Sequence, residues 1–202
     1  MQLRQVNLMR KIFLHMFVSA DGFIESEDKN LDFMVVDVEV EDYINGMLGS
    51  VDTMILGRKA FEVLAGYWPS AAENPSEAAD PARPEPHIEA AHMMNAKRKM
   101  VFSRTLKETS WANSTILGGD LAQEVANLKR QPGRDVALFG GAAIANSMMR
   151  LGLLDEYRLL INPVMLGAGT PLFQGGRGGS TLQLVGSRPF DCGAVLVSYR
   201  PK

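Results

Sequence analysis

The sequence predicts an α/β fold: a mainly parallel, twisted sheet with helices on both faces and a C-terminal antiparallel hairpin. Apolar runs of strand length alternate with segments whose apolar residues recur at helical spacing. The first run, Lys11–Val18, is almost continuously apolar, which is typical of a strand covered on both faces. The last two runs, Thr181–Val185 and Ala194–Tyr199, flank a turn region at 186–193 and predict the hairpin.

Strands and helices follow one another in a regular order between these ends. The predicted helices are Glu39–Leu48, a segment after Gly57 that contains Phe61, Asp120–Lys129 and Ala142–Arg150. The predicted strands are Thr53–Leu56, Lys99–Phe102, Thr115–Leu117, Val136–Phe139 and Tyr157–Ile161. Asp120 is a suitable N-cap, and Gly152 stands where a helix would end. We expect a single domain over 1–202, with its core in 10–200.

Two segments stand outside this alternation. Pro69–Pro86 is rich in proline, and we expect it to be a surface excursion without regular structure. The segment 167–179, "GAGTPLFQGGRGG", is rich in glycine. It indicates either a flexible surface loop or backbone held close to a ligand or a partner subunit.

Composition narrows the possible functions. Of the 202 residues, 46% are hydrophobic and 22% are charged, the net charge is −2, and lysine and arginine form no cluster, so we expect no nucleic-acid partner. No apolar stretch approaches the roughly 20 residues that span a bilayer, so we expect no membrane partner. The single cysteine, Cys192, fits a reducing compartment and a cytoplasmic protein. His87 and His92 are five residues apart and lack further ligands, so we expect no metal site.

A first candidate binding site lies where the predicted strand Thr53–Leu56 ends. Gly57 is followed by Arg58 and Lys59 in the first turn of the next predicted helix. Cations there oppose the helix dipole, whose positive end is at the N-terminus. The arrangement indicates either an anion held by backbone N–H groups and fixed positive charge, or two solvated charges at a helix start.

Two more strand ends repeat this pattern. Ser103 and Arg104 follow one predicted strand, and a hydroxyl beside a guanidinium suits a phosphate monoester. Gly140 and Gly141 follow another, where side chains would keep a flat ring or a pyrophosphate away from the helix start. Ligands of open α/β sheets bind at the carboxyl ends of the strands. The three junctions together predict a dinucleotide with an additional phosphate, although no complete G-x-G-x-x-G motif is present.

Several stretches resemble the dihydrofolate reductase-like superfamily. They are "FVSADGFIE" (17–25), "MILGRKAFE" (54–62), "KMVFSRTL" (99–106) and "VALFGGAAIANSMMRLGLLDEYRLLINPVMLGAGTPLF" (136–173). The last is the most specific and is most similar to the branch that includes the C-terminal reductase domain of bacterial riboflavin biosynthesis. The resemblance covers nearly the whole chain and implies a dihydrofolate reductase-like fold.

The resemblance also implies that the protein binds NADPH. It places the phosphates at Gly57, Arg58 and Lys59, the adenosine 2′-phosphate near Ser103 and Arg104, and the pyrophosphate and nicotinamide over Gly140, Gly141 and Ala142. The family usually has a threonine two residues after the arginine, where this chain has Ala60, and the exchange weakens the predicted cofactor site.

By the same resemblance, we expect a reductase that transfers hydride to a small heterocyclic substrate. The substrate is pterin-like or ribosylaminopyrimidine-like, as in dihydrofolate reductase or in 5-amino-6-(5-phosphoribosylamino)uracil reductase. The alternative is a module that binds NADP(H) or another small ligand without turnover.

The candidate residues on the substrate side of the site are carboxylates. Asp21, in a Ser-x-Asp-Gly turn that resembles the family's, either orients a substrate hydroxyl or amine or bonds its own backbone in a tight turn. Folate reductases carry a carboxylate on the first helix that assists protonation. Spacing back from Gly57 places its counterpart at Glu41 or Asp42, in an acidic cluster that also fits a solvated helix start.

We expect a homodimer, because the family's reductase domains commonly pair. The predicted C-terminal hairpin has apolar residues on both faces, and a monomer's edge hairpin leaves one face uncovered. The neighbouring stretch "NPVMLGAGTPLF" adds further apolar side chains. In the alternative arrangement, the 69–86 excursion or the first ten residues cover this surface within one chain.

Overall fold

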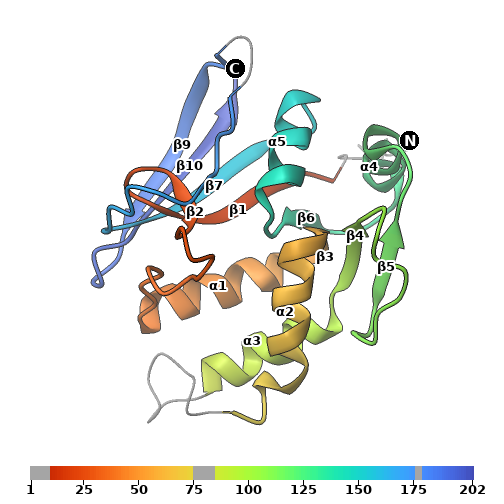
Figure 1. The fold of residues 1–202 in the computed structure, drawn as a ribbon, viewed down its shortest axis with the longest axis horizontal. Coiled ribbons are helices and arrows are strands. Elements are labelled where there is room, and N and C mark those ends of the chain that lie inside the picture. The colour runs from red at the N-terminus through yellow and green to blue at the C-terminus, as the bar shows by residue number, and fades with distance from the viewer. Residues whose placement is uncertain (1–9, 75–84, 176–178) are drawn as a thin grey trace, which may run out of the picture.

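The computed structural model describes residues 10–74, 85–175 and 179–202 and is built on an eight-stranded sheet (Figure 1). The strand order is β5-β4-β3-β6-β1-β7-β10-β9. These strands are β1 (Ile12–Ser19), β3 (Val51–Gly57), β4 (Arg98–Phe102), β5 (Ser114–Leu117), β6 (Asp135–Leu138), β7 (Glu156–Asn162), β9 (Leu182–Pro189) and β10 (Val195–Pro201). All pairs from β5 to β7 are parallel, whereas β10 is antiparallel to both β7 and β9. The predicted fold class is therefore confirmed.

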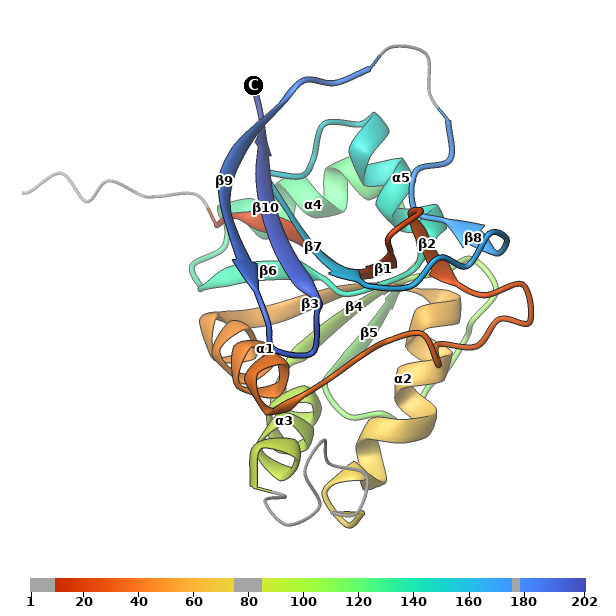
Figure 2. The ribbon, with the colours of Figure 1, turned by 90° about the vertical axis from the view of Figure 1, so that its left-hand side faces the viewer.

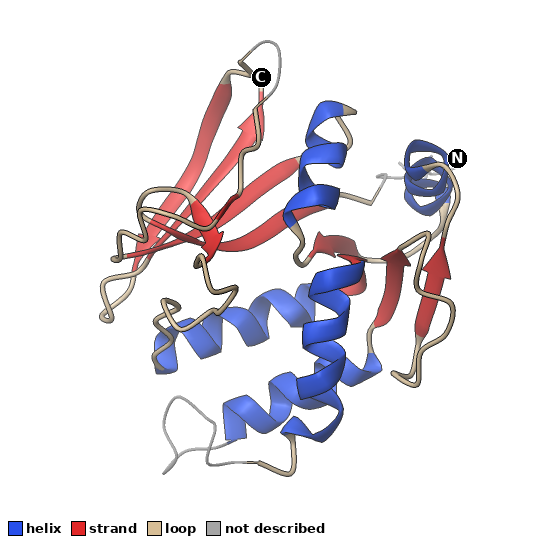
Figure 3. Ribbon diagram, viewed as in Figure 1, coloured by secondary structure: helices blue, strands red, loops and turns tan. Residues whose placement is uncertain are grey.

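Helices cover both faces of the sheet (Figures 2 and 3). On one face lie α1 (Val38–Ser50), α2 (Arg58–Ala71) and α3 (Glu85–Ala96), and on the other lie α4 (Leu121–Arg130) and α5 (Ala142–Arg150). Strand side chains alternate between the two cores. Leu14 of β1 belongs to the core under α4 and α5, and its neighbour Phe13 belongs to the core under α1, α2 and α3. This double coverage explains the continuous apolar run of β1.

The two ends of the segment 69–86 have regular structure, contrary to the prediction. Pro69 lies inside α2, and Glu85 and Pro86 form the first turn of α3, so both ends of the segment are helical. Pro86 is tolerated because the N–H groups of a first helical turn have no partner within the helix. Residues 75–84 of the predicted excursion lie outside the described residues.

The glycine-rich segment contains a short strand that was not predicted. β8 (Thr170–Pro171) pairs with β2 (Phe23–Glu25) to form a separate two-stranded sheet. Gly169 precedes it with φ +138°, and a Cβ there would lie 2.1 Å from the carbonyl oxygen of Glu25. The close backbone approach at this glycine is therefore to β2 of the same chain.

The hairpin turn is shorter than predicted. β9 continues to Pro189, through Gly186, so the turn occupies only 190–194. Glycine and proline are tolerated because β9 is the edge strand of the sheet.

Within the described residues, no helix is long and apolar enough to cross a bilayer.

Candidate cofactor-binding site

The three junctions singled out in the sequence lie along one edge of the sheet (Figure 1). Gly57 ends β3, Ser103 follows β4 and Gly140 follows β6, and these three strands are neighbours and parallel. Their carboxyl ends therefore meet at the same edge, which is where open α/β sheets bind ligands.

Two helices begin at this edge without a side-chain cap. Gly57 is the N-cap of α2 and Gly141 is the N-cap of α5, and neither helix start receives a side-chain hydrogen bond. In α1 and α4, by contrast, the carboxylates of Asp37 and Asp120 each accept a hydrogen bond of 2.8 Å from a backbone N–H in the first turn. The starts of α2 and α5 therefore present unpaired N–H groups and positive dipole ends, which suit an anion.

The glycines at this edge allow the starts of α2 and α5 to pack closely together. Gly140 and Gly141 have φ values of +126° and +95°, which L side chains rarely adopt. A Cβ on Gly140 would lie 3.1 Å from the Cβ of Ala60, and one on Gly57 would lie 3.1 Å from Ile144 Cγ2. The two helix starts are thus packed directly against each other, which the missing side chains of these glycines allow.

The two cations in the first turn of α2 are exposed. The Arg58 guanidinium lies 3.1 Å from the Glu62 carboxylate one turn later, with both side chains more than 40% exposed. An exposed pair of this kind contributes little to stability. Arg58 can therefore exchange Glu62 for an incoming phosphate at small cost, and exposed Lys59 beside it adds positive charge.

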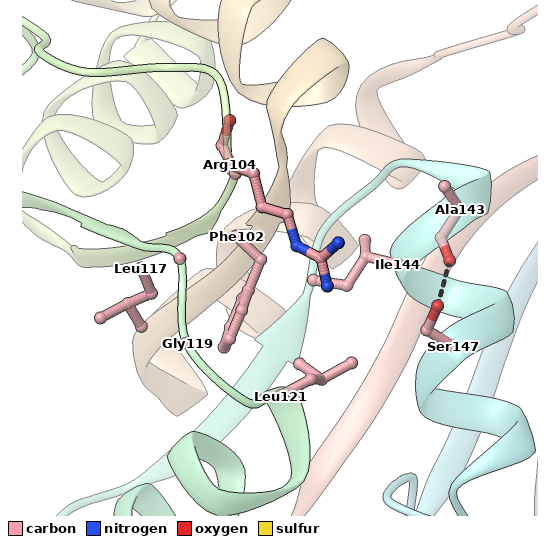
Figure 4. Close-up of a pocket in the computed structure, with 10 residues that line it drawn as sticks. Phe102, Arg104, Leu117, Gly119, Leu121, Ala143, Ile144 and Ser147 are labelled. Carbon is pink, nitrogen blue, oxygen red and sulfur yellow. Dashed lines mark hydrogen bonds between the residues drawn. The ribbon is translucent and has the colours of Figure 1, made fainter.

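A cavity of about 240 Å³ extends this edge between the ends of β4 and β5 and the start of α5 (Figure 4). Its lining residues are Phe102, Ser103, Arg104, Leu117, Gly118, Gly119, Leu121, Ala143, Ile144 and Ser147. The Arg104 side chain extends over the cavity toward Phe102 and Ile144 (Figure 4). In the described part of the chain, its guanidinium has no ion pair or hydrogen bond. Apolar walls with a free guanidinium above them can accept a flat ring that carries a phosphate.

Ser103, at the rim of the cavity, stabilises the turn after β4. Its hydroxyl oxygen accepts hydrogen bonds from the backbone N–H groups of Thr105 (3.2 Å) and Leu106 (2.9 Å), which fixes the turn after β4. Gly118 and Gly119, which also line the cavity, were not predicted as site residues. The signal was present, because this glycine pair follows β5 just as Gly140 and Gly141 follow β6.

Asp21 joins two loops at the end of β1. Its carboxylate accepts hydrogen bonds from the Ser19 hydroxyl (2.6 Å) and from the backbone N–H groups of Gly167 (2.7 Å) and Leu166 (3.1 Å). These bonds, led by that from Ser19, hold the pKa of Asp21 below its usual value. Asp21 is therefore an ionised carboxylate whose hydrogen bonds connect the turn after β1 to the loop after β7.

The two candidate carboxylates on α1 differ in environment. Glu41 is 11% exposed and faces α3, with Oε1 3.9 Å from Nδ1 of His87. Asp42, one residue later, is exposed. His87 is also buried, and its Nε2 lies 3.2 Å from the Tyr67 hydroxyl. Of the two carboxylates, only Glu41 is in a partly desolvated setting.

In the described ranges, no cluster of side chains could hold a metal ion.

Comparison with known proteins places this chain in a family. The RibD C-terminal domain family matches residues 10–196. The chain is 34% identical over 192 residues to the uncharacterized protein YyaP of Bacillus subtilis, covering 94% of each protein. A solved putative riboflavin biosynthesis protein from Shewanella sp. PV-4 has a TM-score of 0.73 at 18% identity and covers 95% of this chain and 99% of that one. Dihydrofolate reductase from Enterococcus faecalis, complexed with NADP(H) and RAB-propyl, has a TM-score of 0.60 at 14% identity, covering 95% and 96%. The fold is thus dihydrofolate reductase-like, and the chain belongs to the RibD C-terminal domain family.

Proposed function

We propose that the protein is an NADPH-dependent reductase of a small heterocyclic substrate, pterin-like or ribosylaminopyrimidine-like. The observation that carries this proposal is the pair of glycine-capped helix starts, α2 and α5, side by side at the carboxyl edge of the sheet. Two unpaired helix N-termini beside Arg58 and Lys59 suit the pyrophosphate of a dinucleotide. The E. faecalis neighbour binds NADP(H) with the same fold, which is consistent with this choice.

The residues present fit this cofactor along its length. The pyrophosphate fits over the adjacent starts of α2 and α5, where Gly57 and Gly141 carry no side chain. The adenine fits the apolar cavity, and its ribose 2′-phosphate fits the Arg104 guanidinium above. The nicotinamide end then extends toward Gly140 and the end of β1. Bound NADPH supplies the hydride, and the protein supplies orientation and charge complementarity.

Binding of NADPH to an Arg58 variant tests the proposal. Loss of a charged hydrogen-bond donor costs about 1.5–3 kcal/mol, so Arg58→Ala raises the NADPH dissociation constant about tenfold or more. The matched control is Arg98→Ala, an exposed arginine at the opposite end of β4 that pairs with Gln131. Calorimetric titration gives both constants. Failure of the wild-type protein to bind NADPH contradicts the proposal.

A dinucleotide-binding module without turnover is the second candidate. Two observations favour it: Ala60 replaces the family's threonine, and the Asp21 carboxylate is already bonded by its own chain. The two functions differ in one measurement. A reductase oxidises NADPH with at least one compound in a panel of pterins, folates and ribosylaminopyrimidines, whereas the module binds NADPH and oxidises it with none.

A further inference from the structure

His15 occupies a buried position in β1 that an apolar ring would fill. It is 2% exposed and stacks on Phe139, with ring centroids 5.4 Å apart at an angle of 11°. Tyr43 of α1 and Phe17 of β1 complete the group, at 5.7 and 5.8 Å from His15. All three partner rings are only partly buried, so the group extends from the core to the surface.

The two polar rings of this group each carry a buried atom without a hydrogen bond. Within the described chain, neither Nε2 of His15 nor the hydroxyl of Tyr43 has a partner. An unpaired buried polar atom destabilises a folded protein, and phenylalanine would keep the ring packing without it. Two such atoms on neighbouring rings are therefore a cost that packing alone does not explain.

Both rings are uncharged at neutral pH. Burial, and secondarily the charge of Arg158, lowers the pKa of His15 to about 3. Burial also raises the pKa of Tyr43 to about 12, with Arg158, Glu156 and Arg188 as the charged groups around it. Arg158 is itself paired with Glu156 at 2.5 Å. A neutral imidazole and a neutral phenol offer both donors and acceptors, which suits the uncharged polar edge of a ligand.

The group lies next to the proposed nicotinamide position. Phe139 directly precedes Gly140, and β1 pairs with β6 along the strand that carries His15. A hydride acceptor must lie against the nicotinamide, at a contact of about 3–3.5 Å. The partly exposed rings of Phe17 and Phe139 are thus available at this point to stack on a flat acceptor.

From these observations we propose that His15 and Tyr43 form the polar end of the substrate subsite, with Phe17 and Phe139 as its stacking walls. The subsite takes a flat, uncharged heterocycle whose edge carries hydrogen-bond donors and acceptors. Because His15 lies behind the other rings, one of them turns aside when the substrate enters. This proposal rests on the proposed reductase function.

The test uses His15→Phe and Tyr43→Phe, with Ser114→Ala as the matched control. Ser114 of β5 also carries a buried hydroxyl without a partner, but it lies outside the ring group. Each of the three changes removes one unpaired polar atom. We expect each to raise Tm by about 2–4 °C. NADPH dissociation constants stay within twofold of wild type for all three.

Substrate readouts separate the variants. Binding of pterins, folates and ribosylaminopyrimidines is measured by calorimetry with and without NADPH, together with NADPH oxidation. His15→Phe and Tyr43→Phe lower affinity and kcat/KM at least tenfold, and Ser114→Ala leaves both within twofold. Unchanged affinity in the two ring variants, a fall in their Tm, or no binding of any panel compound to the wild type overturns the subsite. Absence of NADPH binding overturns the reductase function instead, and the cofactor-free titrations still decide the subsite.

Discussion

Arg58 and Arg104 are both exposed at the proposed cofactor site, but they differ in what they contact. Arg58 is paired with Glu62, whereas Arg104 has no partner in the described part of the chain and extends over the apolar cavity. The sequence predicted both at strand ends, because a cation that follows a buried apolar run can be recognised from the sequence alone. It did not show that one is neutralised and the other free, because that depends on side-chain geometry.

Arg104 is therefore the residue expected to distinguish NADPH from NADH. The two cofactors differ only in the 2′-phosphate, for which a free guanidinium is a strong bidentate partner. Arg104→Ala raises the dissociation constant of NADPH at least tenfold and leaves that of NADH within twofold. Titration of both cofactors checks this. If wild-type protein binds NADH as tightly as NADPH, the roles given to Ser103 and Arg104 are wrong.

His15 also makes a prediction for stability against pH. Its pKa is about 3 in the folded protein and near 6.5 when exposed, so between these values the unfolded chain binds more protons. The titration of His15 therefore leaves the free energy of unfolding unchanged above pH 6.5 and lowers it as pH falls toward 3, by about 1.4 kcal/mol per pH unit. Urea unfolding at pH 4, 5 and 6 should show a shallower loss in His15→Phe than in wild type. Equal slopes would mean that His15 is not held neutral.

At the scale of elements, the starts of α2 and α5 depend on glycines that have no side chain to prevent their close packing. Gly140 precedes α5 at φ +126° with Ala60 against it, so Gly140→Ala strains the backbone and crowds that contact. We expect a loss of about 1–3 kcal/mol in unfolding free energy and weaker NADPH binding. Gly66→Ala is the matched control, because Gly66 lies in α2 with open space around it. That change should stabilise by about 0.5–1 kcal/mol, and denaturant titration compares the two. Equal effects would contradict the role of Gly140.

Helices and strands were predicted correctly from the sequence where the residues that determine them lie within the element or directly beside it. The bounds of α5, Ala142–Arg150, were predicted correctly, because glycines border it on both sides and its apolar spacing is regular. α3 was missed because much of its buried face consists of alanines and a histidine, which give a weak periodic signal. β2 and β8 were missed because two or three residues pair across more than 140 positions. Asp21 was likewise ambiguous, because its backbone partners are 145 and 146 residues away.

At the scale of the whole molecule, the C-terminal hairpin leaves a surface that the described residues of its own chain do not cover. The hairpin was expected to carry apolar residues on both faces and to leave one of them uncovered in a monomer. Ala194 is fully buried, and Leu196 packs in the cluster with Val40 of α1. Leu172 is buried as well. Open apolar side chains remain on the edge strand β9, where Leu184 and Val185 are each 55% exposed.

The proposed homodimer is expected to use this edge. A long edge strand with exposed apolar side chains invites pairing with another strand, and a C₂ pair of β9 strands would satisfy both copies. Leu184→Glu places a charge in that contact and should yield monomers. Val63→Glu is the matched control, because Val63 is 60% exposed on α2, away from β9. Light scattering at low micromolar concentration decides the question. A wild-type mass near the chain's own 22.1 kDa contradicts the dimer, and a mass near twice that value, lost only in Leu184→Glu, assigns the dimer to β9.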